Sequence, residues 1–174
     1  MDLAAHYIGD VTVQFERIKA SGDKAIAQVS DAELVRVLDP ESNSIAIVMR
    51  HIGGNLRSRF TDFLTTDGEK PSRHRDGEFE LPSDLTRQSV LDDWNSGFEC
   101  LFRALRQLKP EDVDRGVHIR GERMSVLEAL NRSMTHTSSH VGQIVWIAKH
   151  LRSTNWRTLS IPRGQSEQFK PGPR

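Results

Sequence analysis

The chain has 174 residues, of which 36% are hydrophobic and 28% are charged, and its 24 basic side chains equal its 24 acidic ones. This length suits a single domain around one continuous core, and the absence of net charge argues against nucleic acid or an anionic membrane as a partner. No apolar run approaches the roughly 18 to 20 residues that cross a bilayer, and the opening residues lack the basic and then apolar pattern of a secretory signal.

The first part of the chain contains two long periodic segments. Apolar residues recur every three or four positions from Ala4 to Val29, which predicts a long helix. Residues Ser30 to Glu33 have the pattern of a capping box and predict a short helix, which Asp39-Pro40 would end. The second long helix is predicted from Ser44 to Phe63, with its end at Thr66-Asp67-Gly68.

A polar linker, residues 67–86, separates the second and third long helices. It has about twenty residues, whereas antiparallel neighbours in a bundle need only about 2 to 8. A linker this long predicts a crossover, which would let the two helices run parallel. The third helix is predicted from Val90 to Leu108. It contains Cys100, the only cysteine, which we interpret as a core residue of a protein from the reducing cytoplasm.

The fourth long helix is predicted from a second capping box, Ser125 to Glu128, through Leu151. Before it, Gly116 to Arg120 could be briefly extended, but no alternation of useful length predicts a sheet. After it, residues 152–174 form a tail whose first half would pack partly on the bundle through its apolar residues. The chain, residues 1–174, is therefore predicted to be one all-α domain, a four-helix bundle with a long crossover between its second and third long helices.

Two histidines four residues apart are the main chemical signal of the sequence. His136 and His140 fall in the fourth helix, where this spacing stacks two imidazoles on one face, as in many helical metal sites. His51 precedes Ile52 in the second helix just as His140 precedes Val141, so all three imidazoles could face one groove between the two helices. The alternative is that the histidines are polar residues on a solvated helix face.

Further polar residues are candidates for the surroundings of this site. Asn55 lies one turn beyond the histidine of the second helix, and Gln143 lies just under one turn beyond the last histidine, so each could hydrogen-bond a ligand or a substrate. The alternative for both is a surface or helix-backbone contact. Arg57 and Arg59 could bind an anionic substrate or be solvated. Arg163 in the tail could line the pocket if the proline-stiffened segment before it folds over the groove.

These residues resemble the motifs of a known superfamily. The segments His51-Ile52-Gly53-Gly54-Asn55-Leu56 and His136-x-x-x-His140-Val141-Gly142-Gln143 are similar to those of the DinB/YfiT-like metal-dependent hydrolases, and residues 159–169 resemble a bacterial branch classed as a domain of unknown function. The resemblance covers nearly the whole chain. It implies an up-down-down-up bundle that binds one divalent cation, zinc or nickel, through His51, His136 and His140. It also makes a homodimer the expected assembly, because bundles of this superfamily often pair through a helix face.

The resemblance leaves the reaction open, because the superfamily also contains transferases and isomerases that use low-molecular-weight thiols. Three neutral imidazoles would leave the full charge on the ion, which could bring the pKa of a bound water to about 7 and would ionise a bound thiol. Thr137 to Ser139 stand where a His-Glu-x-x-His protease carries its base, which argues against a peptidase. A base could come from Glu122 or Glu167, but the sequence identifies no catalytic residue. Of the two reactions, we favour transfer of a thiol to a small molecule over hydrolysis. The alternative is a non-catalytic bundle that binds a metal or another ligand.

Overall fold

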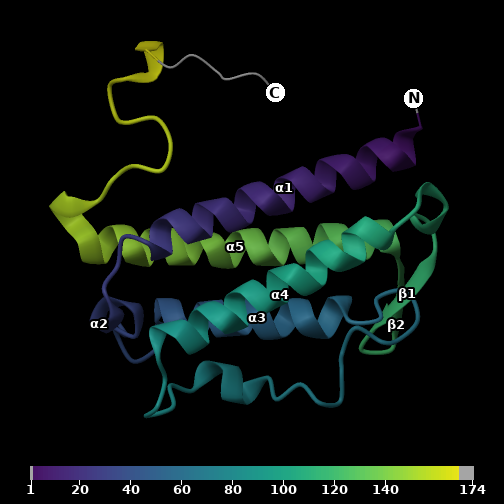
Figure 1. The fold of residues 1–174 in the computed structure, drawn as a ribbon, viewed down its shortest axis with the longest axis horizontal. Coiled ribbons are helices and arrows are strands. Elements are labelled where there is room, and N and C mark those ends of the chain that lie inside the picture. Colours follow the sequence, from purple (N-terminus) through teal and green to yellow (C-terminus); the bar gives the residue numbers. More distant parts are fainter. Residues whose placement is uncertain (1, 169–174) are drawn as a thin grey trace.

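The computed structural model describes residues 2–168 and shows a mostly helical protein (Figure 1). Its helices and strands are, in chain order, α1 (Leu3–Ile26), α2 (Asp31–Leu34), α3 (Ile45–Phe60), α4 (Arg87–Gln107), β1 (Gly116–Ile119), β2 (Glu122–Ser125) and α5 (Val126–Arg152). The short 3-10 turns are η1 (Asp76–Phe79), η2 (Pro110–Asp112), η3 (Ser153–Asn155) and η4 (Ser166–Gln168). The prediction of a helical protein is confirmed, with one β-hairpin added in the described part of the chain. Residues 169–174, the end of the predicted tail, lie outside the described residues.

The helix starts follow the capping residues of the sequence. The hydroxyl of Ser30 accepts from the N–H of Glu33, whose carboxylate accepts from the N–H of Ser30 in return. Ser125 and Glu128 repeat this arrangement at the start of α5. Ser44 caps α3 by accepting from a backbone N–H of its first turn. Both predicted capping boxes are therefore confirmed.

The end of α3 differs from the prediction, because the helix stops at Phe60 and not near Phe63. Thr61 is extended, and Asp62 has a φ of 48°, in the left-handed region that a right-handed helix cannot include. The N–H of Thr65 donates to the carbonyl of Asp62 and closes a turn. Phe63 still packs on Phe60, with ring centroids 5.0 Å apart, so the apolar pattern continues beyond the helix.

The four long helices lie side by side (Figure 1). α1 packs along α5, α3 packs along α4, and α3 also contacts α5. The segment between α3 and α4 runs back along the molecule, so both helices begin at the end that carries α2 (Figure 1). The core between them contains fully buried apolar residues, among them Phe15, Met49, Leu56, Trp94, Phe98, Leu101, Leu130 and Ile144. Removal of this surface from water is the main favourable contribution to folding.

Two glycines bring α3 and α4 into close contact. A Cβ atom at Gly53 would lie 2.3 Å from the carbonyl oxygen of Asp93, and one at Gly97 would lie 2.6 Å from the Cα of Gly53. Only a hydrogen atom fits at either position. The close contact sets the distance between α3 and α4 and the rotation of α3 about its own axis. Because α3 carries His51, it also sets the position of one predicted metal ligand.

The β-hairpin precedes α5. β1 and β2 are antiparallel, with Gly116 opposite Ser125. Arg120 and Gly121 form the turn between them with φ values of 57° and 75°, the conformation that tight hairpin turns favour. The expectation of a brief extended stretch from Gly116 is confirmed, and its pairing with β2 is a finding of the structure.

The tail after α5 packs on the helices only at its start. Trp156 and Leu159 are half-buried against the core, whereas residues 160–168 are exposed and lead away from the helices (Figure 1).

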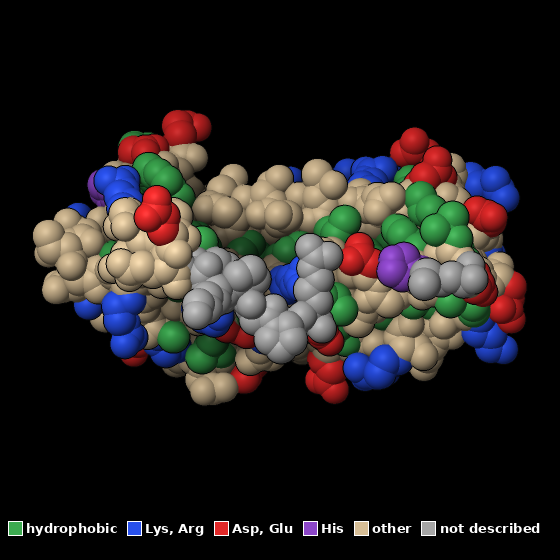
Figure 2. Space-filling model, turned by 90° about the horizontal axis from the view of Figure 1, so that it is seen from above, with side chains coloured by type: hydrophobic (Ala, Val, Ile, Leu, Met, Phe, Trp, Pro, Cys, Tyr) green, Lys and Arg blue, Asp and Glu red, His purple; other side chains and the backbone are tan. Residues whose placement is uncertain are grey.

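None of the described helices combines the length and the apolar character that a membrane crossing requires. On the face shown in Figure 2, basic and acidic side chains both occur at each end of the molecule, consistent with a net charge of zero.

Candidate metal centre

Three imidazoles from two helices meet at one point. His51 comes from the middle of α3, and His136 and His140 come from α5. One nitrogen atom of each ring lies within 4.8 Å of the others, and Nε2 of His51 is 3.3 Å from Nε2 of His136. His51 is 5% exposed, and the other two histidines are half-buried. The structure thus brings together the three histidines that the sequence singles out.

The spacing of the histidines fits a small divalent cation. Two nitrogen atoms that each lie about 2.0 to 2.1 Å from zinc, at a tetrahedral angle, are about 3.4 Å apart. The Nε2 atoms of His51 and His136 are separated by 3.3 Å. Imidazole nitrogen suits both zinc and nickel. Within the described residues the group contains three candidate ligands, so an ion held by them would have coordination positions left for a small molecule.

A buried carboxylate orients the ring of His51. Nδ1 of His51 donates to Oε2 of Glu78 at 2.9 Å, which leaves Nε2 as the nitrogen that faces the other histidines. Arg73 donates to both oxygens of Glu78, each at 2.8 Å. Burial would raise the pKa of Glu78, but the hydrogen bonds from His51 and Arg73 and the charge of Arg73 hold this pKa below its usual value. Glu78 is therefore an ionised acceptor for His51.

The two histidines of α5 are neutral at pH 7. Burial, assisted by the neighbouring His140 and His51, lowers the pKa of His136 to about 4. Burial also lowers the pKa of His140, against the opposing effect of a hydrogen bond with Gln143. In that bond Nδ1 of His140 donates to Oε1 of Gln143 at 2.9 Å, which leaves Nε2 available. A neutral imidazole with a free lone pair is the form that binds a metal.

The glycine after Gly53 explains how Glu78 reaches His51. Glu78 belongs to η1, in the segment that crosses from α3 to α4. A Cβ atom at Gly54 would lie 2.1 Å from Oε1 of Glu78, so the carboxylate occupies the space that a side chain would fill. The neighbouring Phe79 packs on the ring of His51, with centroids 4.9 Å apart. The crossover linker therefore supplies part of the site in addition to connecting two helices.

A cavity of about 190 Å³ opens beside the histidines. Its lining includes His51, His136 and Asn55, and Asn55 is 9% exposed. The structure thus places Asn55 at the cavity and Gln143 against His140. Arg163, by contrast, is exposed in the tail and is not part of the cavity lining, because the segment around it leads away from the helices.

Of the other charged residues that the sequence singles out, some line the cavity or lie next to its lining, and others do not. Arg59 is buried and lines it, whereas Arg57 forms an ion pair with α4 and is not part of its lining. Glu122 lies 3.5 Å from Arg132, which also lines the cavity. Glu167 is exposed in the tail. Of the two carboxylates suggested as bases, Glu122 is therefore the one near the site.

Sequence reasoning does not identify Glu78 and Arg73 as parts of the site. Both lie in the polar linker, where neither an apolar period nor a ligand spacing marks them. The one available signal is the length of the linker, which is enough to run back along the second long helix. A carboxylate in such a segment can reach a histidine of that helix, but many residues of the linker share this possibility.

Fold and site together define a mostly helical protein with a candidate three-histidine metal centre. The family model described as "Protein of unknown function (DUF1572)" matches residues 2–165, almost the whole chain. The chain therefore belongs to the DUF1572 family. No curated protein and no solved structure matches it.

Proposed function

We propose that this protein is a divalent-metal-dependent enzyme that acts on a small molecule, by thiol transfer or by hydrolysis. The observation that carries the proposal is the convergence of His51, His136 and His140 beside a cavity of about 190 Å³. Zinc or nickel is the proposed ion, because neutral imidazoles suit both. A divalent ion held there supplies a Lewis acid that lowers the pKa of water or of a thiol, and both reactions use this chemistry.

The residues around the histidines hold the rings in the orientation that binding requires. Glu78 keeps the proton of His51 on Nδ1, and Gln143 does the same for His140, so both rings present Nε2 to the common point. Arg73 holds Glu78 in place through two hydrogen bonds. Such partners restrict the rotation of the rings, and this preorganisation favours binding of the ion before the substrate arrives.

Thiol transfer is the favoured reaction of the two. A water bound to such an ion, with a pKa of about 7, is only partly ionised at neutral pH, so hydrolysis gains from a protein base within reach of that water. Glu78 is already bound to His51 and Arg73, and Glu122 has a side chain that is 70% exposed. Transfer does not require such a base, because the thiol is ionised before it attacks.

A non-catalytic role is the alternative, in which an ion joins α3 to α5 or the protein sequesters a ligand. Structural zinc sites are usually closed by four protein ligands. Here three residues form the group within the described part of the chain, and a cavity lies beside two of them, His51 and His136. This combination supports a site at which a small molecule can bind to the ion and leave again. It therefore favours the enzyme over the non-catalytic role.

Metal analysis of the purified protein tests the site itself. We expect about one divalent ion per chain, and His136→Ala should weaken its binding by more than about tenfold, because one of the ligands is lost. His74→Ala is the control, because His74 is exposed in the linker. Full retention of the ion by His136→Ala would overturn the assignment.

A thiol-dependence assay separates the two reactions and the non-catalytic role. Metal-loaded protein should conjugate a model electrophile faster when a low-molecular-weight thiol is present, and His140→Ala should abolish this gain. Metal-dependent cleavage of an ester or amide at the same rate with and without thiol would favour hydrolysis instead. Metal binding without either activity, across a panel of electrophiles and esters, would favour the non-catalytic role.

We also propose that the chain has the DinB/YfiT-like fold, an up-down-down-up four-helix bundle. Its support is the direction of the long helices in Figure 1, where α1 and α5 run one way and α3 and α4 run the other. An experimental structure with α3 and α4 antiparallel would contradict this topology.

We also propose that the protein is located in the cytoplasm, because its single cysteine, Cys100, is a buried free thiol.

A further inference from the structure

Among the residues that the structure describes, five arginines and no acidic side chain line the cavity beside the histidines. They come from α3, the crossover linker, the hairpin turn and α5, and they are Arg59, Arg73, Arg75, Arg120 and Arg132. Guanidinium groups gathered around one space repel each other unless negative charge compensates them. The position of the counter-ions therefore decides what the cavity can bind.

The counter-ions of three of these arginines lie outside the cavity lining. Glu69 accepts from Arg59 at 3.0 Å and from Nε of Arg120 at 2.9 Å. Glu78 accepts from Arg73 and also from a histidine of the site. Two carboxylates thus serve three guanidinium groups, and both carboxylates belong to the lining of another cavity and not of this one.

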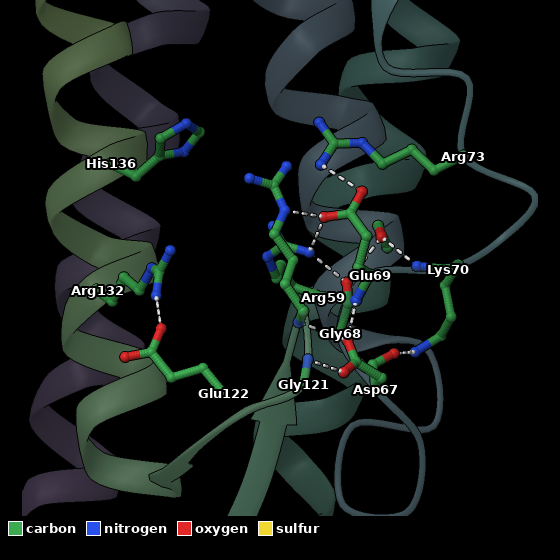
Figure 3. A network of polar contacts seen from close by, with 12 residues as sticks. Arg59, Asp67, Gly68, Glu69, Lys70, Arg73, Gly121, Glu122, Arg132 and His136 are labelled. Carbon is green, nitrogen blue, oxygen red and sulfur yellow. Dashed lines mark hydrogen bonds and ion pairs between the residues drawn. The ribbon is translucent and has the colours of Figure 1, made fainter.

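The remaining two arginines are less firmly paired. Arg132 lies 3.5 Å from Glu122, whose side chain is 70% exposed, and Arg75 lies 3.6 Å from Asp76, whose side chain is 99% exposed. Exposed ion pairs at such distances are weak. Figure 3 shows Arg132 and His136 projecting from α5 towards the side on which the arginines of α3 and the linker lie. Positive charge is therefore in excess around the cavity.

A buried hydroxyl in the same cavity lacks a protein partner. Ser133 is 7% exposed and lines the cavity, and its Oγ makes no hydrogen bond within the described residues. It lies one turn before His136 and therefore on the same face of α5. Buried polar groups almost always have a partner, so this hydroxyl points to a ligand that supplies one.

We infer that this cavity binds an anionic group, a carboxylate or a phosphate, of the small-molecule substrate. The inference rests on the proposed function, for which it names the class of substrate. The guanidinium groups of Arg132 and Arg75 match the paired oxygen atoms of either anion, and the hydroxyl of Ser133 donates to one of them. The rest of the substrate reaches the histidines, because His51 and His136 line the same cavity.

Calorimetric titration of the full chain with small anions tests this inference. Inorganic phosphate and acetate are the probes, acetamide is the uncharged counterpart of acetate, and each is titrated into zinc-loaded and into metal-free protein. We expect at least one anion to bind both forms and acetamide to bind neither. Arg132→Gln should weaken anion binding about tenfold, the loss expected for one charge-assisted hydrogen bond, without changing the zinc content.

Two further variants complete the test. Ser133→Ala should weaken anion binding by a smaller factor, about threefold, because a neutral donor is lost. Arg17→Gln changes an exposed arginine of α1 and should bind the anion as the wild type does. Unchanged affinity in Arg132→Gln, or binding of acetamide as tight as that of acetate, would overturn the inference.

The outcomes also identify the anion and separate the two proposals. Tighter binding of phosphate than of acetate assigns the group to a phosphate ester, and the reverse order assigns it to a carboxylic acid. A protein that binds zinc but no anion in either form contradicts only the present inference. Anion binding that depends on Arg132 in a protein that binds no zinc contradicts only the proposed function.

Discussion

Among single residues, Glu78 connects the histidine cluster to the rest of the protein, since it accepts from both His51 and Arg73. Glu78→Gln keeps an acceptor for His51 but removes the charge opposite Arg73. We expect the affinity for zinc to fall about tenfold or more, the usual loss when the partner of a ligating histidine is altered. Competition with a chromogenic chelator measures the change. Glu80→Gln, at an exposed position two residues on, should leave the affinity unchanged.

Gly54 offers a second way to disturb the same contact without touching a polar group. In Gly54→Ala the new methyl group would occupy the position now taken by Oε1 of Glu78, 2.1 Å from the ideal Cβ position. We expect weaker zinc binding, by about tenfold, with the helical content retained. Gly142→Ala is the matched control, because its Cβ would have open space although it lies two residues after His140. Equal zinc affinity in the two variants would contradict the role of Gly54.

The sequence predicts the three histidines of the site but does not predict Glu78. His136 and His140 lie on one helix, so their spacing alone brings them together, and His51 is marked by its place beside an apolar stripe. Glu78 meets His51 only because the linker folds back along α3 and because Gly54 leaves room for it. Contacts of this kind depend on tertiary packing, and local patterns do not report them.

At the scale of elements, Asp67 joins the crossover linker to the hairpin turn. Its Oδ1 accepts from the N–H groups of Glu69 and Arg120, at 2.7 and 2.9 Å, and its Oδ2 accepts from the N–H of Gly121 at 2.7 Å. These hydrogen bonds, with that of Glu69 first, lower the pKa of Asp67 to about 2. A carboxylate with a lowered pKa stabilises the folded state as long as it is ionised.

Asp67→Asn should therefore lower stability in a pH-dependent way. The amide loses the charge and presents an N–H₂ group to one backbone donor, so we expect a loss of about 1 to 2 kcal/mol at pH 7. Because the pKa rises from about 2 to its ordinary 3.8 on unfolding, the wild type has its full advantage above about pH 5 and loses it as the pH falls towards 2. Urea unfolding at several pH values measures this. Asp84→Asn, at an exposed position in the same linker, should show no such difference.

The long helices are predicted well, because their apolar period and their capping boxes are local properties of the sequence. Ser125 and Glu128 place the start of α5, for instance, without reference to any other element. The β-hairpin is not predicted, because its strands are only four residues long and the turn at Arg120-Gly121 lacks the usual Asn-Gly or Asp-Gly signal. Its position depends on contacts with the linker, such as those of Asp67.

At the scale of the whole molecule, α5 exposes a large aromatic side chain on the face that also carries Gln143. Trp146 is 61% exposed and stacks on His150, with ring centroids 5.6 Å apart. We propose that two copies of the chain pair through this face and form a homodimer. Light scattering across the micromolar range should then give twice the mass of the chain, and Trp146→Ser should shift the mass towards that of a monomer. A monomeric mass of the wild type throughout this range would contradict the proposal.

Removal of the proposed ion should affect the whole molecule, because its ligands belong to different helix pairs. His51 lies on α3, which packs on α4, whereas His136 and His140 lie on α5, which packs on α1. An ion bound by all three histidines holds the two pairs together and binds only the folded state. Such binding adds about 2.7 kcal/mol of stability when the free ion is at 100 times its dissociation constant. In a chain of this length that corresponds to about 5 to 10 °C in Tm.

Differential scanning calorimetry with and without a chelator measures this effect. We expect the wild type to lose about 5 to 10 °C in Tm when zinc is removed, and to regain it when zinc is added back. His136→Ala should show at most about half of this difference, because the loss of one ligand weakens binding of the ion by about tenfold or more. His74→Ala should respond as the wild type does, since His74 is exposed and lies outside the histidine cluster. A wild-type Tm that does not depend on zinc would show that these histidines do not join the two helix pairs through a metal.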